Sequence, residues 1–138
     1  MIIRDRNREE LAKNIRSAYP LAGELHLQFG NCHFQVQSNS ESVIIGLKQY
    51  YSFFATSPSE PDRLISVFQA DDFIVLIPLT EKTPDPGKTR IKEEFADIDN
   101  GRIVRKRLTG MVFVFGGTDH IAIGPCIENL NQVVNFIN

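Results

Sequence analysis

The run Gly87–Thr89 has the Gly-Lys-Thr residue types that end a phosphate-binding loop. In such a loop, backbone N–H groups and the lysine surround the phosphates between a strand and a helix. The rest of the motif is missing, because Lys82 stands where the first glycine is needed, and Pro84 and Pro86 have no N–H to donate. An extended segment also follows where a helix is required. We therefore interpret the run as an ordinary turn and predict no nucleotide site in it.

Two histidines, His26 and His33, are the next candidates. In the hairpin predicted below they are diagonal neighbours on one polar face, close enough to share a ligand or a metal. A third ligand at a suitable spacing is missing, so the pattern favours exposed polar strand residues without a metal. We keep His26 and His33 as candidate ligand-binding residues only.

The third histidine, His120, follows Asp119, and the two could form a base–carboxylate pair. Serine and cysteine nucleophiles occur elsewhere, but no spacing connects them to this pair. The favoured interpretation is an aspartate that stabilises a turn beside an exposed histidine. The sequence therefore contains no complete catalytic motif, and we predict no catalytic residue and no metal ligand.

The densest basic run, residues 102–107, contains three arginines and a lysine. On a strand, Arg105 and Arg107 point to the same side, where they could bind a phosphate or an acidic partner. Acidic residues at 93, 94, 97 and 99 belong to the predicted partner strand, so the favoured alternative is mutual neutralisation on a solvated ribbon. Arg105 and Arg107 complete the set of candidate ligand-binding residues.

The composition is that of one globular domain. The chain has 138 residues, 42% hydrophobic and 23% charged, with a net charge of −2, which excludes disorder and a general attraction to nucleic acid. The N-terminus lacks the apolar core of a signal peptide, and no apolar run approaches the roughly 20 residues that cross a bilayer. We expect a cytoplasmic protein, without membrane or nucleic-acid partners, whose two cysteines, Cys32 and Cys126, are reduced core thiols.

The first elements to position these residues are a helix and a hairpin. Apolar spacing predicts a helix capped by Asp5 and ended near Tyr19 by a proline. A hairpin with its turn at Gly30-Asn31 should pair Phe29 with Cys32. Strand alternation then places His26 and His33 on the polar face, opposite a face that is entirely apolar.

A second helix and two strands should follow. Ser38 with Glu41 fits a capping box, in front of a broad apolar stripe. Leu64–Gln69 and Phe73–Ile77 read as strands, and the second is so apolar that we expect it to be central in the sheet. Thr80–Arg90 reads as a surface loop.

The last third should contain two hairpins and a helix. Asn100-Gly101 predicts a turn that pairs Asp99 with Arg102 and Glu94 with Arg107. A second hairpin, residues 111–115 and 120–123, is apolar on both faces and should be buried. Pro125 suits the first turn of a final helix with one apolar side, formed by Ile127, Leu130, Val133, Val134 and Ile137. The expected fold is α+β, a mixed and largely antiparallel sheet built from hairpins, with about three packed helices in one domain, 1–138.

Parts of this chain resemble a known family. The Leu-Thr-Gly-Met-Val-Phe-Val-Phe stretch at 108–115, the Gly-Pro-Cys turn at 124–126 and the Asn-rich stretch at 129–138 are similar to the segment that leads into the kinase module of bacterial HPr-serine-kinase-related proteins. The Ile-Gly-Leu-Lys-Gln-Tyr-Tyr segment at 45–51 is similar too. The resemblance rests on structural residues and not on a chemical signature.

The resemblance implies an accessory role. In that family an N-terminal α+β region precedes an ATP-binding module, which supplies the lysine, the serine and the metal-binding acid of phosphoryl transfer. No counterpart of those residues is present here. The resemblance therefore implies a domain that presents substrate, holds a dimer together or gates the kinase site, with ATP and Mg²⁺ bound only in the further module. Its partners would be that C-terminal module, a protein substrate and a second copy of the chain.

The final helix pattern is still running at Asn138, without a C-cap glycine or a proline stop, so we expect the native chain to continue into such a module. The alternative is a complete small protein that binds a ligand or a partner through the polar face around His26 and His33, or through the ribbon around Arg105 and Arg107. A free-standing hydrolase that uses His120 is the third hypothesis.

Overall fold

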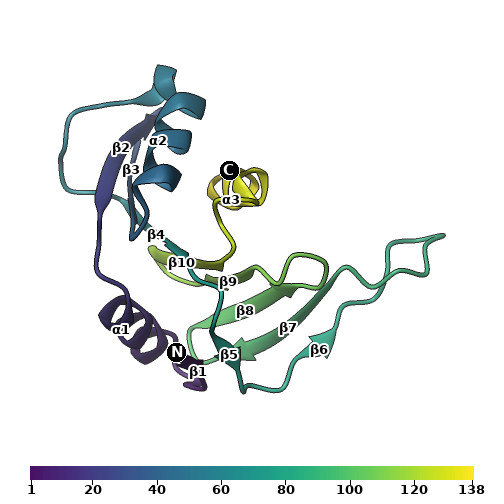
Figure 1. Ribbon diagram of the computed structural model, residues 1–138. Helices are drawn as coiled ribbons and strands as arrows, with labels where there is room; N and C mark the ends of the chain where they lie inside the picture. The colour runs from purple at the N-terminus through teal and green to yellow at the C-terminus, as the bar shows by residue number, and fades with distance from the viewer.

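The computed structural model, which describes residues 1–138, is a twisted sheet with helices on both faces (Figure 1). It confirms the predicted α+β class, with three α-helices and a mixed, mostly antiparallel sheet of eight strands. No helix is long and apolar enough to pass through a bilayer. The elements in chain order are β1 (Ile2–Ile3), α1 (Arg8–Ala18), β2 (Gly23–Phe29), β3 (Cys32–Ser38), α2 (Glu41–Tyr50), the 3-10 helix η1 (Ser52–Phe54), β4 (Arg63–Gln69), β5 (Ile74–Val75), β6 (Thr80–Glu81), β7 (Glu93–Ile98), β8 (Gly101–Lys106), β9 (Val112–Phe115), β10 (Asp119–Gly124) and α3 (Leu130–Ile137).

The main sheet has the order β2-β3-β4-β10-β9-β8-β7-β6. Two of its pairings, β3 with β4 and β4 with β10, are parallel, and the other five are antiparallel. Strand alternation sends one set of side chains to a core under α2 and α3 and the other set to a core under α1. Val67 lies in the first core and its neighbour Phe68 lies in the second.

The β2–β3 hairpin forms in the predicted register. Phe29 pairs with Cys32, and the ladder continues to Gly23 opposite Ser38. Gly30 has a φ of +59°, which a glycine adopts at no steric cost in the first position of the turn. The candidate residues His26 and His33 therefore share one face, as expected.

Both predicted helix caps are wrong by two residues. Asn7, and not Asp5, caps α1, because its side chain accepts a hydrogen bond from the backbone N–H of Glu10 at 3.1 Å. Ser40 caps α2 in the same way, while Ser38 is the last residue of β3 and is fully buried. The expected capping box is absent because the sheet extends as far as Ser38.

The segment Phe73–Ile77 is not the central strand that its apolar residues predict. Only β5 forms, and it pairs in parallel with β1 in a separate two-stranded sheet. Ile74 and Leu76 are each 57% exposed. Both edges of β4 are already occupied by β3 and β10, so no central position is left for this segment.

The β7–β8 hairpin is shifted by two residues from the predicted register. Asp99 and Asn100 form the turn, and Arg102 pairs with Asp97 and not with Asp99. Only glycine fits at the first position of β8, because a Cβ on Gly101 would lie only 2.2 Å from the carbonyl oxygen of Phe115. A shift of two keeps every side chain on its predicted face.

The C-terminal hairpin is buried as predicted, and β10 is central because it pairs with both β9 and β4. The final helix is shorter than predicted. It begins at Leu130, after a turn in which the N–H of Asn129 donates to the carbonyl of Cys126, so Pro125 precedes the helix. Ile127 is half exposed and does not share the apolar side of α3.

Arg8 fastens the start of α1 to two hairpin turns. Its Nε donates to the carbonyl of Asn100 at 2.9 Å, and its Nη1 donates to the carbonyl of Asp119 at 3.2 Å. A Cβ added to Gly116 would lie 2.5 Å from Cδ of Arg8, so the turn before β10 closes directly on the arginine stem. The side chain of Arg8 is 11% exposed, and no other residue type presents donors in this fork.

We expect Arg8→Ala to lower the free energy of unfolding by about 2 to 3 kcal/mol, because buried carbonyl acceptors lose their donors and the stem loses its packing. Arg8→Lys should recover less than half of that loss, since an ammonium cannot reach both carbonyls. Urea unfolding followed by circular dichroism measures the effect. Arg4→Ala, at an exposed arginine, is the control and should unfold like the wild type. Equal stability of the Arg8→Ala and Arg4→Ala variants would contradict this role.

Candidate functional site

The two candidate histidines are in direct contact. Nδ1 of His26 lies 2.8 Å from Nε2 of His33, and Nε2 of His26 lies 3.1 Å from a carboxylate oxygen of Glu24. Nδ1 of His33 lies 3.2 Å from both the amide oxygen of Gln28 and the hydroxyl of Ser59. The polar face of the hairpin thus carries a continuous row of hydrogen-bonding groups that ends at Glu24.

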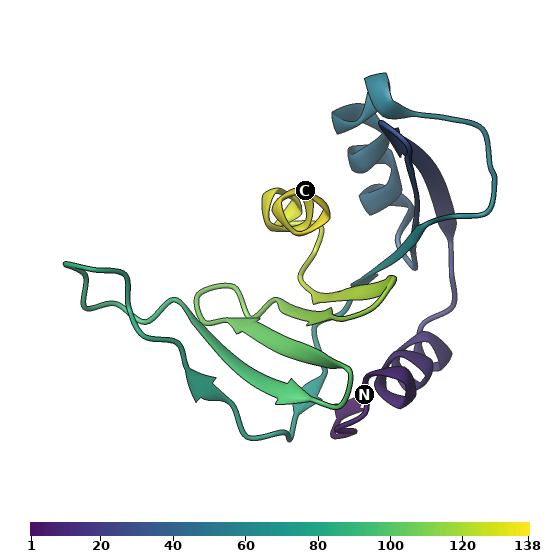
Figure 2. The ribbon, with the colours of Figure 1, turned by 180° about the vertical axis from the view of Figure 1, so that it is seen from behind.

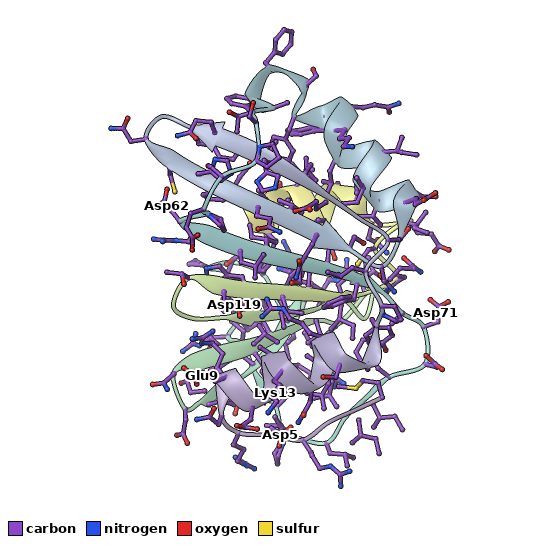
Figure 3. The ribbon with its side chains drawn as sticks, turned by 90° about the vertical axis from the view of Figure 1, so that its left-hand side faces the viewer. Asp5, Glu9, Lys13, Asp62, Asp71 and Asp119 are labelled. Carbon is purple, nitrogen blue, oxygen red and sulfur yellow. The ribbon has the colours of Figure 1, made fainter.

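The expected exposure of these histidines is wrong. His33 is 6% exposed, and the side chain of His26 is 8% exposed. They are covered by residues 55–62, which we call the strap. Figures 1 and 3 show this segment passing the β2–β3 hairpin between η1 and β4. The strap is fastened at one end by the N–H of Thr56, which donates to the carbonyl of His26, and at the other by mutual hydrogen bonds between Asp62 and His33.

The hydrogen-bonding partners limit where the ring protons lie. The carboxylate of Glu24 only accepts, so Nε2 of His26 must donate to it. Nδ1 of His26 then accepts from Nε2 of His33, and Nδ1 of His33 accepts from the hydroxyl of Ser59. The row of contacts therefore runs from Ser59 of the strap through both imidazole rings to Glu24.

Arg105 and Arg107 are engaged by carboxylates. Arg105 lies 3.4 Å from Glu94, and Arg107 lies 3.4 Å from Glu94 and 3.6 Å from Glu81. The neutralised ribbon expected as the alternative is therefore present, in the shifted register described above. The structure does not bring these arginines to the histidines, which lie at the other end of the sheet.

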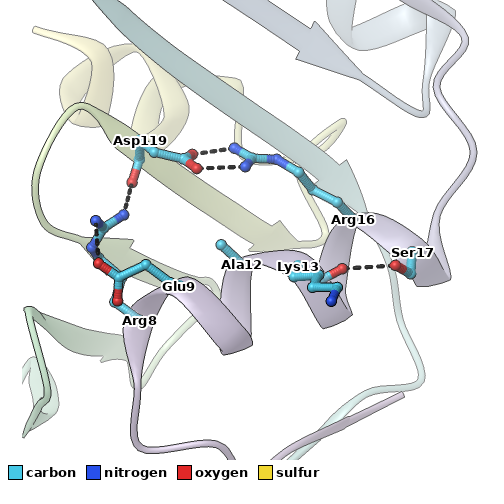
Figure 4. A pocket seen from close by; sticks show the side chains of 7 residues that line it. All are labelled: Arg8, Glu9, Ala12, Lys13, Arg16, Ser17 and Asp119. Carbon is cyan, nitrogen blue, oxygen red and sulfur yellow. Dashed lines mark hydrogen bonds and ion pairs between the residues drawn. The ribbon is translucent and has the colours of Figure 1, made fainter.

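A cleft of about 490 Å³ runs beside α1 (Figure 4). Its main charged groups are Arg16 and Asp119, which form a two-pronged ion pair, and Arg8, which donates to the carbonyl of Asp119. Arg16 also donates to the buried hydroxyl of Ser66 through Nε and Nη2. These contacts hold α1 against β4 and β10, so Arg8, Arg16 and Asp119 have a structural role in the cleft.

His120 is half-buried beside the same turn. Its Nδ1 accepts a hydrogen bond from the N–H of Gly116 at 3.4 Å, which requires a neutral ring. Burial lowers the pKa of His120; the carboxylate of Asp119 opposes this effect, and Arg63 and Arg8 add to it. Asp119 is held by Arg16, so the base–carboxylate pair considered as an alternative does not form. The exposure expected of His120 in the favoured interpretation is wrong, because the ring is half-buried.

The two cysteines form no disulfide, and both are free as predicted. Cys126 is a core thiol, fully buried, and donates to the carbonyl of Phe68, whereas Cys32 is only partly buried and is not the core thiol that we expected. Burial raises the pKa of Cys126 to about 12, so its thiol stays protonated. The Gly87–Thr89 run is also as predicted, because Gly87 lies in an exposed turn with a φ of +78°.

Another recess lies between α3 and strands β7, β8 and β9. This α3 groove, of about 440 Å³, has an apolar floor and side formed by Val104, Phe113, Phe115 and Phe136. The ring centroids of Phe115 and Phe136 are 5.1 Å apart. Amide side chains project from α3 along the groove, from Asn131, Gln132 and Asn135. An aromatic floor with a few polar groups can bind an apolar or flat ligand group while hydrogen-bonding its polar edge.

None of the residues that line the α3 groove was predicted from the sequence as a site residue. The sequence signal of the groove is the row of amides on α3, Asn131, Gln132 and Asn135, beside Phe136, which packs at the edge of the core. No family model matches this chain, and neither a curated protein nor a solved structure matches it. The candidate site is therefore described by its geometry alone.

The His26–His33 pair should hold the strap in place. We expect His33→Ala to raise the amide hydrogen-exchange rates of residues 55–62 by at least about tenfold, because the side-chain contacts to Ser59 and His26 are lost. Gln35→Ala is the control, since Gln35 lies on the same face but its side chain bonds only to Glu24. Exchange measured by mass spectrometry checks this. Unchanged strap protection in His33→Ala would contradict the assignment.

The neutral state of the His120 ring should make the free energy of unfolding depend on pH. Because the pKa of His120 is lowered from its ordinary value of 6.5, the unfolded chain binds a proton that the folded chain does not. This part of the stability is present above pH 6.5 and is lost as the pH falls below it. Replacing the ring by His120→Gln should flatten the stability profile in this window, as measured by urea unfolding from pH 8 to pH 5. Profiles that stay parallel for wild type and variant would contradict it.

Proposed function

We propose that residues 1–138 form a non-catalytic accessory domain that acts in the cytoplasm with an ATP-binding module of the HPr-serine-kinase-related type. The domain presents a protein substrate, holds a dimer together or gates the kinase site. ATP and Mg²⁺ belong to that module and not to this chain. The module itself, a protein substrate and a second copy of the chain are the proposed partners.

The observation that carries this proposal is the position of the residues that resemble the family. The stretches 108–115 and 129–138 are separated by residues 116–128, and Phe113 and Phe115 of the first form one aromatic cluster with Phe136 of the second. Together they line most of the α3 groove. Residues that resemble a kinase-adjoining segment thus share one open surface, which suits contact with a neighbouring module or its substrate.

The engaged state of the charged groups supports a non-catalytic role. Arg16 and Asp119 are committed to each other, Arg105 is held by Glu94, and the thiol of Cys126 is protonated and buried. A catalytic acid, base or nucleophile needs access to a substrate.

A second candidate function is a free-standing ligand- or protein-binding domain. The α3 groove favours it to the same degree, because an aromatic floor beside three amide side chains suits an external ligand as well as a module of the same protein. The two candidates differ in what the gene encodes beyond codon 138.

Reading the coding sequence onward distinguishes them. We expect a strand followed by G-x-x-x-x-G-K-[ST] soon after codon 138, and no heat beyond dilution when Mg·ATP is titrated into the purified 138-residue chain. In the longer protein, Phe115→Ala should reduce phosphoryl transfer to its substrate at least about fivefold with the KM for ATP unchanged. Phe53→Ala is the matched control, because Phe53 is 96% exposed on η1, remote from the groove. An early stop codon, or micromolar ATP binding by the isolated chain, would contradict the proposal.

A further inference from the structure

Residues 82–92 form an arm that leaves the sheet between β6 and β7 (Figures 1 and 2). The N–H of Lys88 donates to the carbonyl of Asp85, and Gly87 between them has a φ of +78°. With a proline at the second position, this is the geometry of a type II turn. The turn reverses the arm and returns its basic residues toward the sheet.

A cavity of about 190 Å³ lies between the two sides of the arm and the end of β8, and no hydrophobic residue lines it. Two carboxylates, Asp85 and Glu93, line it together with five cationic side chains, so cations exceed carboxylates by three. The whole chain, by contrast, has a net charge of −2. The positive charge is therefore concentrated locally. Its cations are Lys82, Lys88, Arg90, Lys92 and Lys106.

Only two of these cations are neutralised, and they share one carboxylate. Lys82 and Lys106 both bind Glu93, Lys82 at 3.1 Å. Burial alone would raise the pKa of Glu93, but the hydrogen bonds from Lys106 and Lys82 lower it, so Glu93 stays ionised. Lys88, Arg90 and Lys92 make no ion pair and no side-chain hydrogen bond in the structure, which leaves three of the five cations for an external anion.

The basic cavity and the α3 groove share two lining residues, Glu93 and Lys106. A second recess, of about 430 Å³, adjoins both, because Arg90 and Lys92 of the cavity and Gln132 of the groove also line it. Lys106 lines the basic cavity, the recess and the groove. Between the two ends the exposed side chain of Leu108 adds an apolar contact.

We propose that this surface binds an extended protein segment carrying a phosphorylated side chain. The phosphate lies in the basic cavity, near Lys88, Arg90 and Lys92, and an apolar side chain a few residues away lies on the aromatic floor of the α3 groove. A phosphate monoester carries nearly two negative charges and three acceptor oxygens, which match the free donors. An open row of three recesses fits an extended ligand better than a compact one. The proposal goes beyond the accessory function and does not depend on a following kinase module.

The assay uses the 138-residue chain and a fluorescein-labelled peptide, Gly-Ala-Phe-Ala-Gly-pSer-Ala-Gly, followed by fluorescence anisotropy at low salt. We expect the phosphoserine peptide to bind at least about tenfold tighter than the same peptide with serine. The double variant Arg90→Gln/Lys92→Gln should remove that difference, and Phe115→Ala should weaken binding of both peptides. Lys48→Gln, which removes one exposed cation from α2 at the other end of the sheet, is the control and should bind like the wild type.

Competition identifies the source of the phosphate. Unlabelled phosphopeptide should displace the probe at lower concentration than inorganic phosphate, Mg·ATP or a ten-nucleotide single-stranded RNA. Stronger displacement by ATP, by RNA or by inorganic phosphate would overturn the proposal. So would equal binding of the phosphorylated and unphosphorylated peptides, or full binding by Arg90→Gln/Lys92→Gln. Displacement by ATP would also count against the accessory function. The other results do not bear on that function, which the coding sequence and the phosphoryl-transfer assay test separately.

Discussion

The parallel pairing of β4 with β10 is the contact on which the architecture depends. It joins strands β2, β3 and β4 to strands β10, β9, β8, β7 and β6, and it aligns six residue pairs that are 55 positions apart in sequence. Arg16 reinforces this seam from α1, because it binds Asp119 at the start of β10 and Ser66 within β4. A charged pair that is only partly buried keeps part of its hydration, so its two-pronged geometry positions the helix at a modest desolvation cost.

The position of α1 explains where the surface stays open. With α1 on one face, α2 and α3 pack on the other, where α3 shares a core with Met111 and Phe113. Figures 1 and 2 show α3 over the middle of the curved sheet, with the β7–β8 ribbon and the arm extending past it. The α3 groove and the basic cavity both lie in this uncovered part. On the opposite face the strap covers the polar side of the hairpin, which leaves His26 and His33 inside the structure.

Charge is divided unequally between these regions. Around α1 and on the β7–β8 ribbon, cations meet carboxylates at close range, as with Arg16 and Asp119 or Arg102 and Asp97. Exposed pairs of this kind contribute little to stability, but they neutralise the charges that they join. The arm differs, because three cations without an ion pair, Lys88, Arg90 and Lys92, line one cavity. Binding at such a site is local, and the slightly negative net charge of the chain conceals it.

Local patterns in the sequence were sufficient for the α+β class, the β2–β3 register and the burial of the C-terminal hairpin, because strand alternation and turn glycines act over a few residues. They also placed His26 and His33 on one face. Only the tertiary structure decided that the strap buries this pair, that Phe73–Ile77 is excluded from the sheet and that the arm and α3 adjoin. These outcomes depend on which strands occupy the edges of β4 and on contacts between residues far apart in the chain, such as Arg16 with Asp119, for which one sequence contains no periodic signal.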